Sequence, residues 1–162
     1  MTLTYRQEYR KLGAAAPELQ VLLPQEWLAT VALPAAGSED TASASLPPFL
    51  LLPHCTEKTT APQSAALWIE VFSRFGIPLT TTAAGCCGMA GTYGHEVRHR
   101  ATSETIFRSS WGRLLTPVDS HREVLATGYS CRCQARRFAQ QDLRHPVQLL
   151  TEALRKRLAP SC

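Results

Sequence analysis

Short apolar runs and helix-length amphipathic segments alternate along the second part of the chain. The clearest run, Phe49-Leu50-Leu51-Leu52, is bounded by prolines, a pattern typical of a buried β-strand. Two further strands are predicted at 77–82, where β-branched residues gather, and at 124–127. These three runs predict the strands of one sheet.

Between the strands, apolar residues recur at helical spacing. A helix is predicted over roughly 62–75, with Pro62 in its first turn, where proline is tolerated best. Further helices are expected at about 95–113 and 147–158, and a short one should begin near Cys131. Alternating strands and helices predict an α/β fold that is Rossmann-like, with a mainly parallel sheet flanked by helices.

The first part of the chain has a different pattern and is expected to form an N-terminal arm and linker. Residues 21–23 are predicted to form a short strand, and Pro24 is predicted to open a helix. Residues 35–46 are rich in small and polar residues, which is typical of a linker. We therefore divide the chain into an arm and linker at 1–47 and a folded domain at 48–162.

Composition restricts the class of protein. The 162 residues are 44% hydrophobic and 19% charged, which suits a packed domain, and the formal net charge of +4 is too mild to demand a nucleic acid partner. The charged, aromatic N-terminus does not resemble a secretory signal, and no apolar run approaches the ~20 residues of a membrane span. We expect a soluble, cytoplasmic protein.

Six cysteines are the main candidates for chemistry. In a reducing compartment, clustered thiols more often bind metal or carry out redox chemistry than form disulfides. Four of them follow predicted strands: Cys55, Cys86, Cys87 and Cys131. Because parallel strands end on one edge of a sheet, these four side chains are expected to meet there. Cys133 lies two residues further on and is a fifth candidate, whereas Cys162 is treated as incidental.

Several kinds of site fit these thiols. Cysteine thiolates bind soft metals, so an iron–sulfur cluster and a tetrahedral zinc site both remain open. The glycines at 85, 88 and 91 would let backbone amides approach the sulfurs. Buried core cysteines, a strained Cys86–Cys87 disulfide and a reactive low-pKa thiol are the alternatives.

Two histidines and several charged residues flank the cysteines. His54 and His95 are candidates for metal binding or proton transfer, against the plainer interpretation of structural hydrogen bonding. His145 is more typical of a helix start. The flanking charged and aromatic residues bind a carboxylate substrate, orient the histidines or form a solvated rim: Glu57, Lys58, Tyr93, Glu96 and Arg132. The basic residues near the C-terminus form either a solvated helix face or a docking surface, without any nucleic-acid-binding motif: Arg136, Arg137, Arg144, Arg155, Lys156 and Arg157.

The order of the cysteine motifs resembles a known family. A Cys, then Cys-Cys-Gly after a long gap, then a closing cysteine pair is similar to the cysteine-rich CCG domain of heterodisulfide reductase and glycolate oxidase iron–sulfur subunits. In this chain these are Cys55, Cys86-Cys87-Gly88 and Cys131-Arg132-Cys133. The closing pair is Cys-x-Cys, whereas the family has Cys-x-x-Cys, and only one CCG unit is present.

A closer resemblance is to the C-terminal region of FAD-linked, iron–sulfur D-2-hydroxyacid (D-2-hydroxyglutarate) dehydrogenases. It spans roughly residues 48–150 and rests on four stretches, at 52–58, 86–96, 128–134 and 145–147. The resemblance implies a domain that binds an iron–sulfur cluster of 4Fe–4S type through its cysteines and supports electron transfer. FAD-binding and ferredoxin-like domains of the same enzyme would be its partners, with FAD held there. The chain would then be a fragment or subunit, inactive alone. A structural zinc module without a redox role is the alternative.

Overall fold

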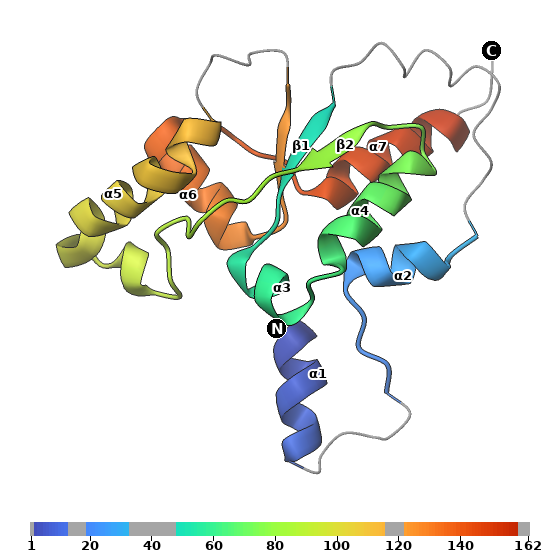
Figure 1. Cartoon of the computed structure of the whole chain (residues 1–162), viewed down its shortest axis with the longest axis horizontal. Coiled ribbons are helices and arrows are strands. Elements are labelled where there is room, and N and C mark those ends of the chain that lie inside the picture. The colour runs from blue at the N-terminus through green and yellow to red at the C-terminus, as the bar shows by residue number, and fades with distance from the viewer. Residues whose placement is uncertain (1, 13–18, 33–47, 116–121, 159–162) are drawn as a thin grey trace.

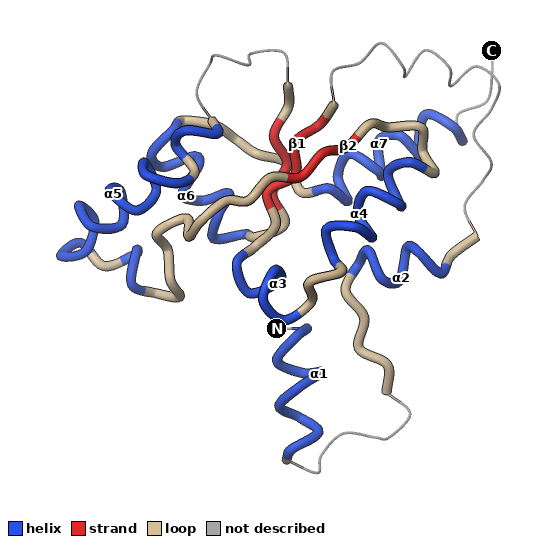
Figure 2. The backbone as a smooth tube through the Cα atoms, viewed as in Figure 1, coloured by secondary structure: helices blue, strands red, loops and turns tan. Residues whose placement is uncertain are grey.

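A computed structural model describes residues 2–12, 19–32, 48–115 and 122–158. It shows a three-stranded sheet with helices on both faces (Figures 1 and 2). The strands are β1 (Phe49–Leu52), β2 (Leu79–Thr81) and β3 (Val124–Ala126). The α-helices are α1 (Thr2–Lys11), α2 (Pro24–Thr30), α3 (Cys55–Thr60), α4 (Ser64–Ser73), α5 (Arg100–Ser110), α6 (Tyr129–Ala139) and α7 (Pro146–Leu158).

The sheet is parallel throughout its described strands, in the order β2-β1-β3. Leu50 of β1 stands opposite Thr80 on one side and Val124 on the other. The predicted α/β fold with a parallel sheet is therefore confirmed. Because all three strands run the same way, their carboxyl ends share one edge, and α3 lies directly beyond the end of β1 (Figure 1).

The central strand is apolar on both faces because helices cover both faces. Leu50 and Leu52 pack with Phe107 and Trp111 in the layer of α5 and α6. Leu51 points the other way and packs with Trp68 and other residues of α4 and α7. All three leucines are at most 1% exposed. Successive strand residues alternate between faces, so a continuous apolar run is what a doubly covered strand requires.

The helix predicted over roughly 62–75 is confirmed as α4 with shifted bounds, whereas the short α3 before it was not predicted. α3 begins immediately at Cys55, with His54 as its N-cap, and α4 begins only at Ser64. Between them Ala61 leaves the helical region, with φ −142° and ψ 66°. A residue that precedes proline is sterically disfavoured in the α region, so Pro62 ends α3 at Ala61, and α4 begins two residues after this proline.

The other predicted elements are found with shifted bounds. The helix expected at 95–113 consists of α5 together with three 3₁₀ turns: η2 (Tyr93–His95), η3 (Val97–His99) and η4 (Gly112–Leu114). The short helix expected near Cys131 is the eleven-residue α6, which begins at Tyr129. α7 matches the helix predicted at 147–158. No described helix has the length and apolar character needed to cross a membrane.

The arm contains more structure than its composition predicts. The helix opened by Pro24 is confirmed as α2, whereas α1 was not predicted. The strand predicted at 21–23 is wrong, because the Val21 carbonyl accepts hydrogen bonds from the Arg6 guanidinium at 2.9 and 2.7 Å. The linker predicted at 35–46 lies outside the described residues.

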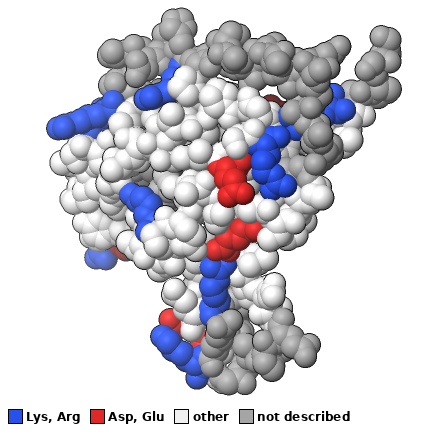
Figure 3. All heavy atoms as spheres, turned by 45° about the vertical axis from the view of Figure 1, so that its right-hand side comes forward, with Lys and Arg blue, Asp and Glu red and all other residues white. Residues whose placement is uncertain are grey.

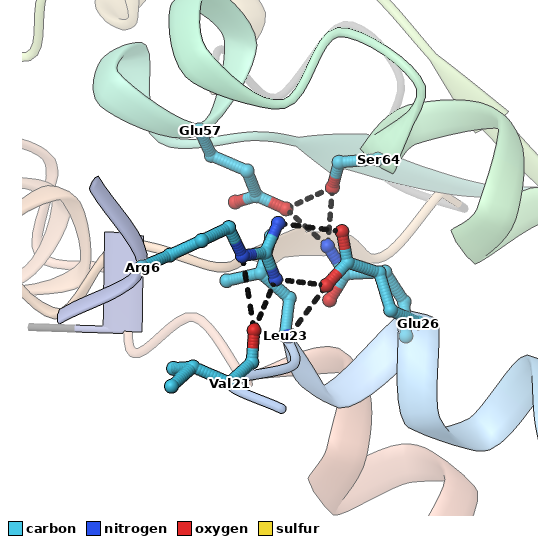
Figure 4. Close-up of polar contacts among 7 residues, drawn as sticks. Arg6, Val21, Leu23, Glu26, Glu57 and Ser64 are labelled. Atoms are coloured by element: carbon cyan, nitrogen blue, oxygen red, sulfur yellow. Dashed lines mark hydrogen bonds and ion pairs between the residues drawn. The ribbon is translucent and has the colours of Figure 1, made fainter. Parts of the chain in front are cut away.

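Helix α2 is fixed to the domain at both ends. At its start the buried Gln25 amide donates to Glu57 Oε1 (3.1 Å) and Ser64 Oγ (2.5 Å), while Arg6 pairs with Glu26 (Figure 4). At its end the Arg74 guanidinium, at the C-terminus of α4, donates to the carbonyls of Leu28, Ala29 and Val31. These carbonyls have no partner within their own helix, so Arg74 caps α2 from outside.

The Gln25 contact can be tested by truncation. Gln25→Ala removes a donor from a buried carboxylate and should lower the free energy of unfolding by about 1–3 kcal/mol. The measurement is urea unfolding followed by tryptophan fluorescence. Gln20→Ala is the control, since Gln20 is exposed on the same arm, and its effect should stay within about 0.5 kcal/mol. Equal effects of the two substitutions would contradict the docking of α2.

Candidate functional site: cysteines at the carboxyl edge of the sheet

The candidate cysteines lie just after the ends of the three strands, at one edge of the sheet. Cys55 is the first residue of α3, just after β1. Cys86 and Cys87 lie in the loop that follows β2, and Cys131 lies in the first turn of α6, just after β3. All five described cysteines are free thiols, so the Cys86–Cys87 disulfide is not formed.

Cys87 and Cys131 form a buried pair. Their residues are 4% and 2% exposed, and their thiols are hydrogen-bonded to each other. The bond from Cys131, with the backbone N–H groups of Met89 and of Cys87 itself, lowers the pKa of Cys87 to about 7. Contact with Cys87, and then burial, raises the pKa of Cys131. Cys131 is therefore the donor of the pair, and Cys87 is the sulfur on which negative charge is stabilised.

Cys55 and His54 lie beside this pair on the more exposed side. The charge of Cys55 contributes to the raised pKa of Cys131, so the two sulfurs are within electrostatic reach. The His54 ring accepts at Nδ1 from the Thr56 N–H (3.3 Å), and burial lowers its pKa. The neutral ring therefore carries its proton on Nε2, which lies 3.4 Å from Ser130 Oγ and 4.0 Å from Cys55 Sγ. His54 is both a helix cap and a neighbour of the thiols.

Gly128 permits the close approach of these groups. It is the N-cap of α6, with an ordinary φ of −77°. A Cβ atom at this position would lie 2.5 Å from His54 Cδ2 and 2.7 Å from Cys131 Sγ. Glycine is therefore required here by space alone, because a methyl group would separate His54 from Cys131.

The remaining candidates are less closely grouped. Cys86 accepts a hydrogen bond at Sγ from the Gly88 N–H, at 3.3 Å. Cys133 follows Cys131 by two positions on α6, and residues at that spacing face different sides of a helix. His95 is exposed at the end of η2, and no hydrogen bond or ion pair of the described residues joins its ring to a cysteine.

A buried carboxylate lies behind the thiols. Glu57 of α3 is 7% exposed and accepts from four donors: Gln25 Nε2, Ser64 Oγ, Trp68 Nε1 and Thr127 Oγ1. Thr127 also accepts from the His54 backbone N–H at 2.9 Å. Glu57 therefore fixes the segment that carries His54 and Cys55 and is not part of a solvated rim. Sequence patterns gave no signal for this, since its donors come from three separate segments.

The other flanking residues have structural partners. Lys58 Nζ donates to Ala84 O, and Arg132 donates to the carbonyls of Ala126 and Thr127 at 3.0 and 3.2 Å. The Tyr93 ring stacks on His99 at 3.8 Å, and Glu96 pairs with Arg98.

Some of the basic residues near the C-terminus are also partnered within the chain. Arg144 pairs with Glu123 and Glu152 at 2.6 Å, and Arg136 lies 3.5 Å from Asp142. On the face drawn in Figure 3, acidic side chains lie next to basic ones and much of the remaining surface is uncharged. These pairs support the interpretation of a solvated face.

The donor chemistry fits a thiolate-bound metal or cluster. Cys87 and Cys131 are in contact, Cys55 is in electrostatic reach, and backbone N–H groups already point at Cys86 and Cys87. Among residues 2–12, 19–32, 48–115 and 122–158, no three His, Cys, Asp or Glu side chains are grouped closely enough to hold a metal ion as they stand. Fold and site together define a class: an α/β domain with a cysteine site at the carboxyl edge of a parallel sheet.

Comparison with known proteins refines this class. The chain is 49% identical over 152 residues to a D-2-hydroxyglutarate dehydrogenase of Pseudomonas putida, which covers 94% of this chain and 14% of that protein. It is 42% identical over 156 residues to the D-2-hydroxyglutarate dehydrogenase of Escherichia coli, with 96% and 15% covered. The Haemophilus influenzae enzyme of the same name is 41% identical over 160 residues.

The chain is therefore homologous to part of these dehydrogenases, and it spans about one seventh of the length of the relatives it matches. No protein-family model matches the chain, and no solved structure matches it significantly.

Gly128→Ala tests the close approach at the site. The added methyl group would overlap His54 and Cys131, so we expect the free energy of unfolding to fall by about 1–3 kcal/mol. Gly112→Ala is the matched control, because its Cβ would meet nothing closer than 3.7 Å. Both variants are compared with the unsubstituted chain by thermal and urea unfolding. If Gly128→Ala were as stable as Gly112→Ala, the side chains of His54 and Cys131 would not be in the close contact described here.

His145→Asn tests a partly buried histidine that caps α7. Burial, and then Arg132, lowers the pKa of His145 to about 4, while its Nδ1 accepts from the Val147 N–H at 3.1 Å. The unfolded chain binds this proton below a pH of about 6.5, so stability is complete above that pH and falls toward pH 4. Asparagine keeps an acceptor for the cap but does not titrate.

Unfolding at pH 7.0 and pH 4.5 checks this pH dependence. The unsubstituted chain should lose more stability between the two pH values than His145→Asn does. An equal loss in both proteins would mean that His145 is not held neutral.

Proposed function

We propose that this chain is the cysteine-rich, iron–sulfur-binding domain of a FAD-linked D-2-hydroxyglutarate dehydrogenase. The observation that carries the proposal is the convergence of Cys55, Cys87 and Cys131 from three strand ends. The relatives add support, because three D-2-hydroxyglutarate dehydrogenases are identical to this chain at 41–49% of aligned residues.

Each residue has a proposed role in this function. Cys55, Cys86, Cys87 and Cys131 are the proposed ligands, with Cys133 as a further candidate. A bound iron–sulfur cluster would supply single-electron transfer, which complements the hydride chemistry of a flavin. His54 holds the Cys55 segment, and with its proton on Nε2 it offers a donor to the sulfur at 4.0 Å. His95 is exposed and remains a candidate for proton transfer only.

The rest of the enzyme is part of the proposal. The relatives are about seven times as long as this chain, so the FAD-binding and ferredoxin-like domains are expected in the remaining part. The domain would act as an electron relay or close the substrate site, and it would be inactive by itself. A structural zinc site is the alternative, because the same thiols are suitable tetrahedral ligands.

Metal analysis of anaerobically purified protein tests the proposal. Iron with acid-labile sulfide and a broad visible absorption band is the expected result. Cys87→Ser and Cys131→Ser should lose most of the iron, because these are the buried sulfurs, while Cys162→Ser should keep it. A stoichiometric amount of zinc without visible absorption would favour the structural zinc site over the iron–sulfur cluster. Iron content unaffected by Cys87→Ser and Cys131→Ser together would sink the proposed ligand set.

A further inference from the structure

Five consecutive backbone carbonyls in the cysteine loop each accept a hydrogen bond from a side chain. The acceptors run from Ala84 to Gly88. In order, the donors are Lys58 Nζ, Trp111 Nε1 (3.1 Å), Ser110 Oγ (2.6 Å), Gln134 Nε2 (3.0 Å) and Ser103 Oγ (2.8 Å). We call these five side chains the carbonyl clamp. They come from α3, from α5 and its C-cap, and from α6, so three helices hold one loop.

The clamp determines where the amides of the loop point. In a trans peptide, the carbonyl of one residue and the N–H of the next point in opposite directions, and the described residues contain no cis peptide. Gln134 of the clamp donates a hydrogen bond to the Cys87 carbonyl. The Gly88 N–H therefore points to the opposite side of the peptide, where it donates to Cys86 Sγ at 3.3 Å. In the same way, Ser103 donates to the Gly88 carbonyl, and the backbone N–H of Met89 helps to lower the pKa of the Cys87 thiol.

Three of the five clamp residues, Ser103, Trp111 and Gln134, are buried, while Lys58 and Ser110 are partly buried. Ser103 and Gln134 are 0% exposed, and Gln134 Nε2 also donates to Ser103 Oγ at 2.7 Å. Gln134 Oε1 has no hydrogen-bond partner among the described residues, so only the amide nitrogen accounts for a glutamine here. Gly88 completes the fit, since a Cβ atom would lie 2.3 Å from Ser103 O and its φ is +83°.

Backbone N–H groups aimed at sulfur stabilise negative charge on it. In iron–sulfur proteins such N–H groups are one of the factors that set the reduction potential, because reduction adds negative charge to the cluster. In this loop the clamp side chains bind the carbonyls on the side opposite to the N–H groups.

We propose that Ser103, Ser110 and Gln134 are positioning residues that keep the amides of residues 87–89 directed at the cysteine sulfurs and thereby set the reduction potential of the bound cluster. The part that concerns the cluster rests on the proposed function, whereas the direction of the amides does not.

A double substitution in α5 tests this. Ser103→Ala/Ser110→Ala removes two clamp donors and keeps good helix formers, and Ser109→Ala is the control, since Ser109 is exposed on the same helix and bonds only to Ile106 O. Gln134→Met is a second variant that keeps volume without the donor. Ser110→Thr keeps a hydroxyl and should behave like the unsubstituted chain.

Two measurements are made on the full chain. The first is the reduction potential of the anaerobically purified protein, which should become more negative in the double variant and in Gln134→Met. The second is NMR hydrogen exchange of the Gly88 and Met89 amides in the cluster-free chain, which should speed up about tenfold when a hydrogen bond is lost. Ser109→Ala should leave both unchanged.

The two measurements separate this inference from the proposed function. If no variant binds iron but exchange rises only in the clamp variants, the clamp stands and the iron–sulfur function fails. If iron is bound and neither potential nor exchange differs from Ser109→Ala, the clamp is overturned and the iron–sulfur function stands. Absence of iron with unchanged exchange would overturn both.

Discussion

Parallel pairing of β1 between β2 and β3 is the constraint on which this molecule depends. It sends three chain segments, distant in sequence, out of the same edge of the sheet, and each segment carries a cysteine. It also buries β1 on both faces, which explains why Leu50, Leu51 and Leu52 form an uninterrupted apolar run. One arrangement of backbone hydrogen bonds thus creates both the core and the site.

Around that edge, polar groups are arranged so that charge is concentrated on one sulfur. Cys131 donates, Cys87 accepts, and the loop adds backbone N–H groups to the same acceptor. Behind the thiols, Glu57 is buried with four donors, which offsets the cost of removing a carboxylate from water. The site therefore combines an apolar surround with hydrogen-bond partners for the Glu57 carboxylate and the Cys87 thiol, whereas Gln134 Oε1 has none among the described residues.

Sequence patterns predict the parts of this structure that depend on local periodicity. The three strands, α7 and the placement of cysteines at strand ends follow from runs of apolar residues and from the geometry of parallel sheets. The short helix α3 was missed because its six residues, Cys55–Thr60, are mostly polar and show no apolar periodicity. The roles of Gln25, Glu57 and Gln134 could not be predicted, since each depends on partners far away in the chain. The extended segment at 21–23 was mistaken for a strand because composition does not reveal whether a neighbouring strand exists.

The docking of α2 shows that the boundary of the folded domain differs from the boundary at which the amino-acid composition changes. The polar, small-residue stretch at 35–46 marks where the chain loses its apolar pattern, yet the buried core extends past it to Gln25 on the other side. A gene fusion or truncation that cut at this stretch would leave Glu57 with one donor fewer and uncover Ser64. The smallest segment that keeps these contacts therefore includes α2. Recombination that moves this domain between proteins has to transfer α2 together with the residues that follow the linker.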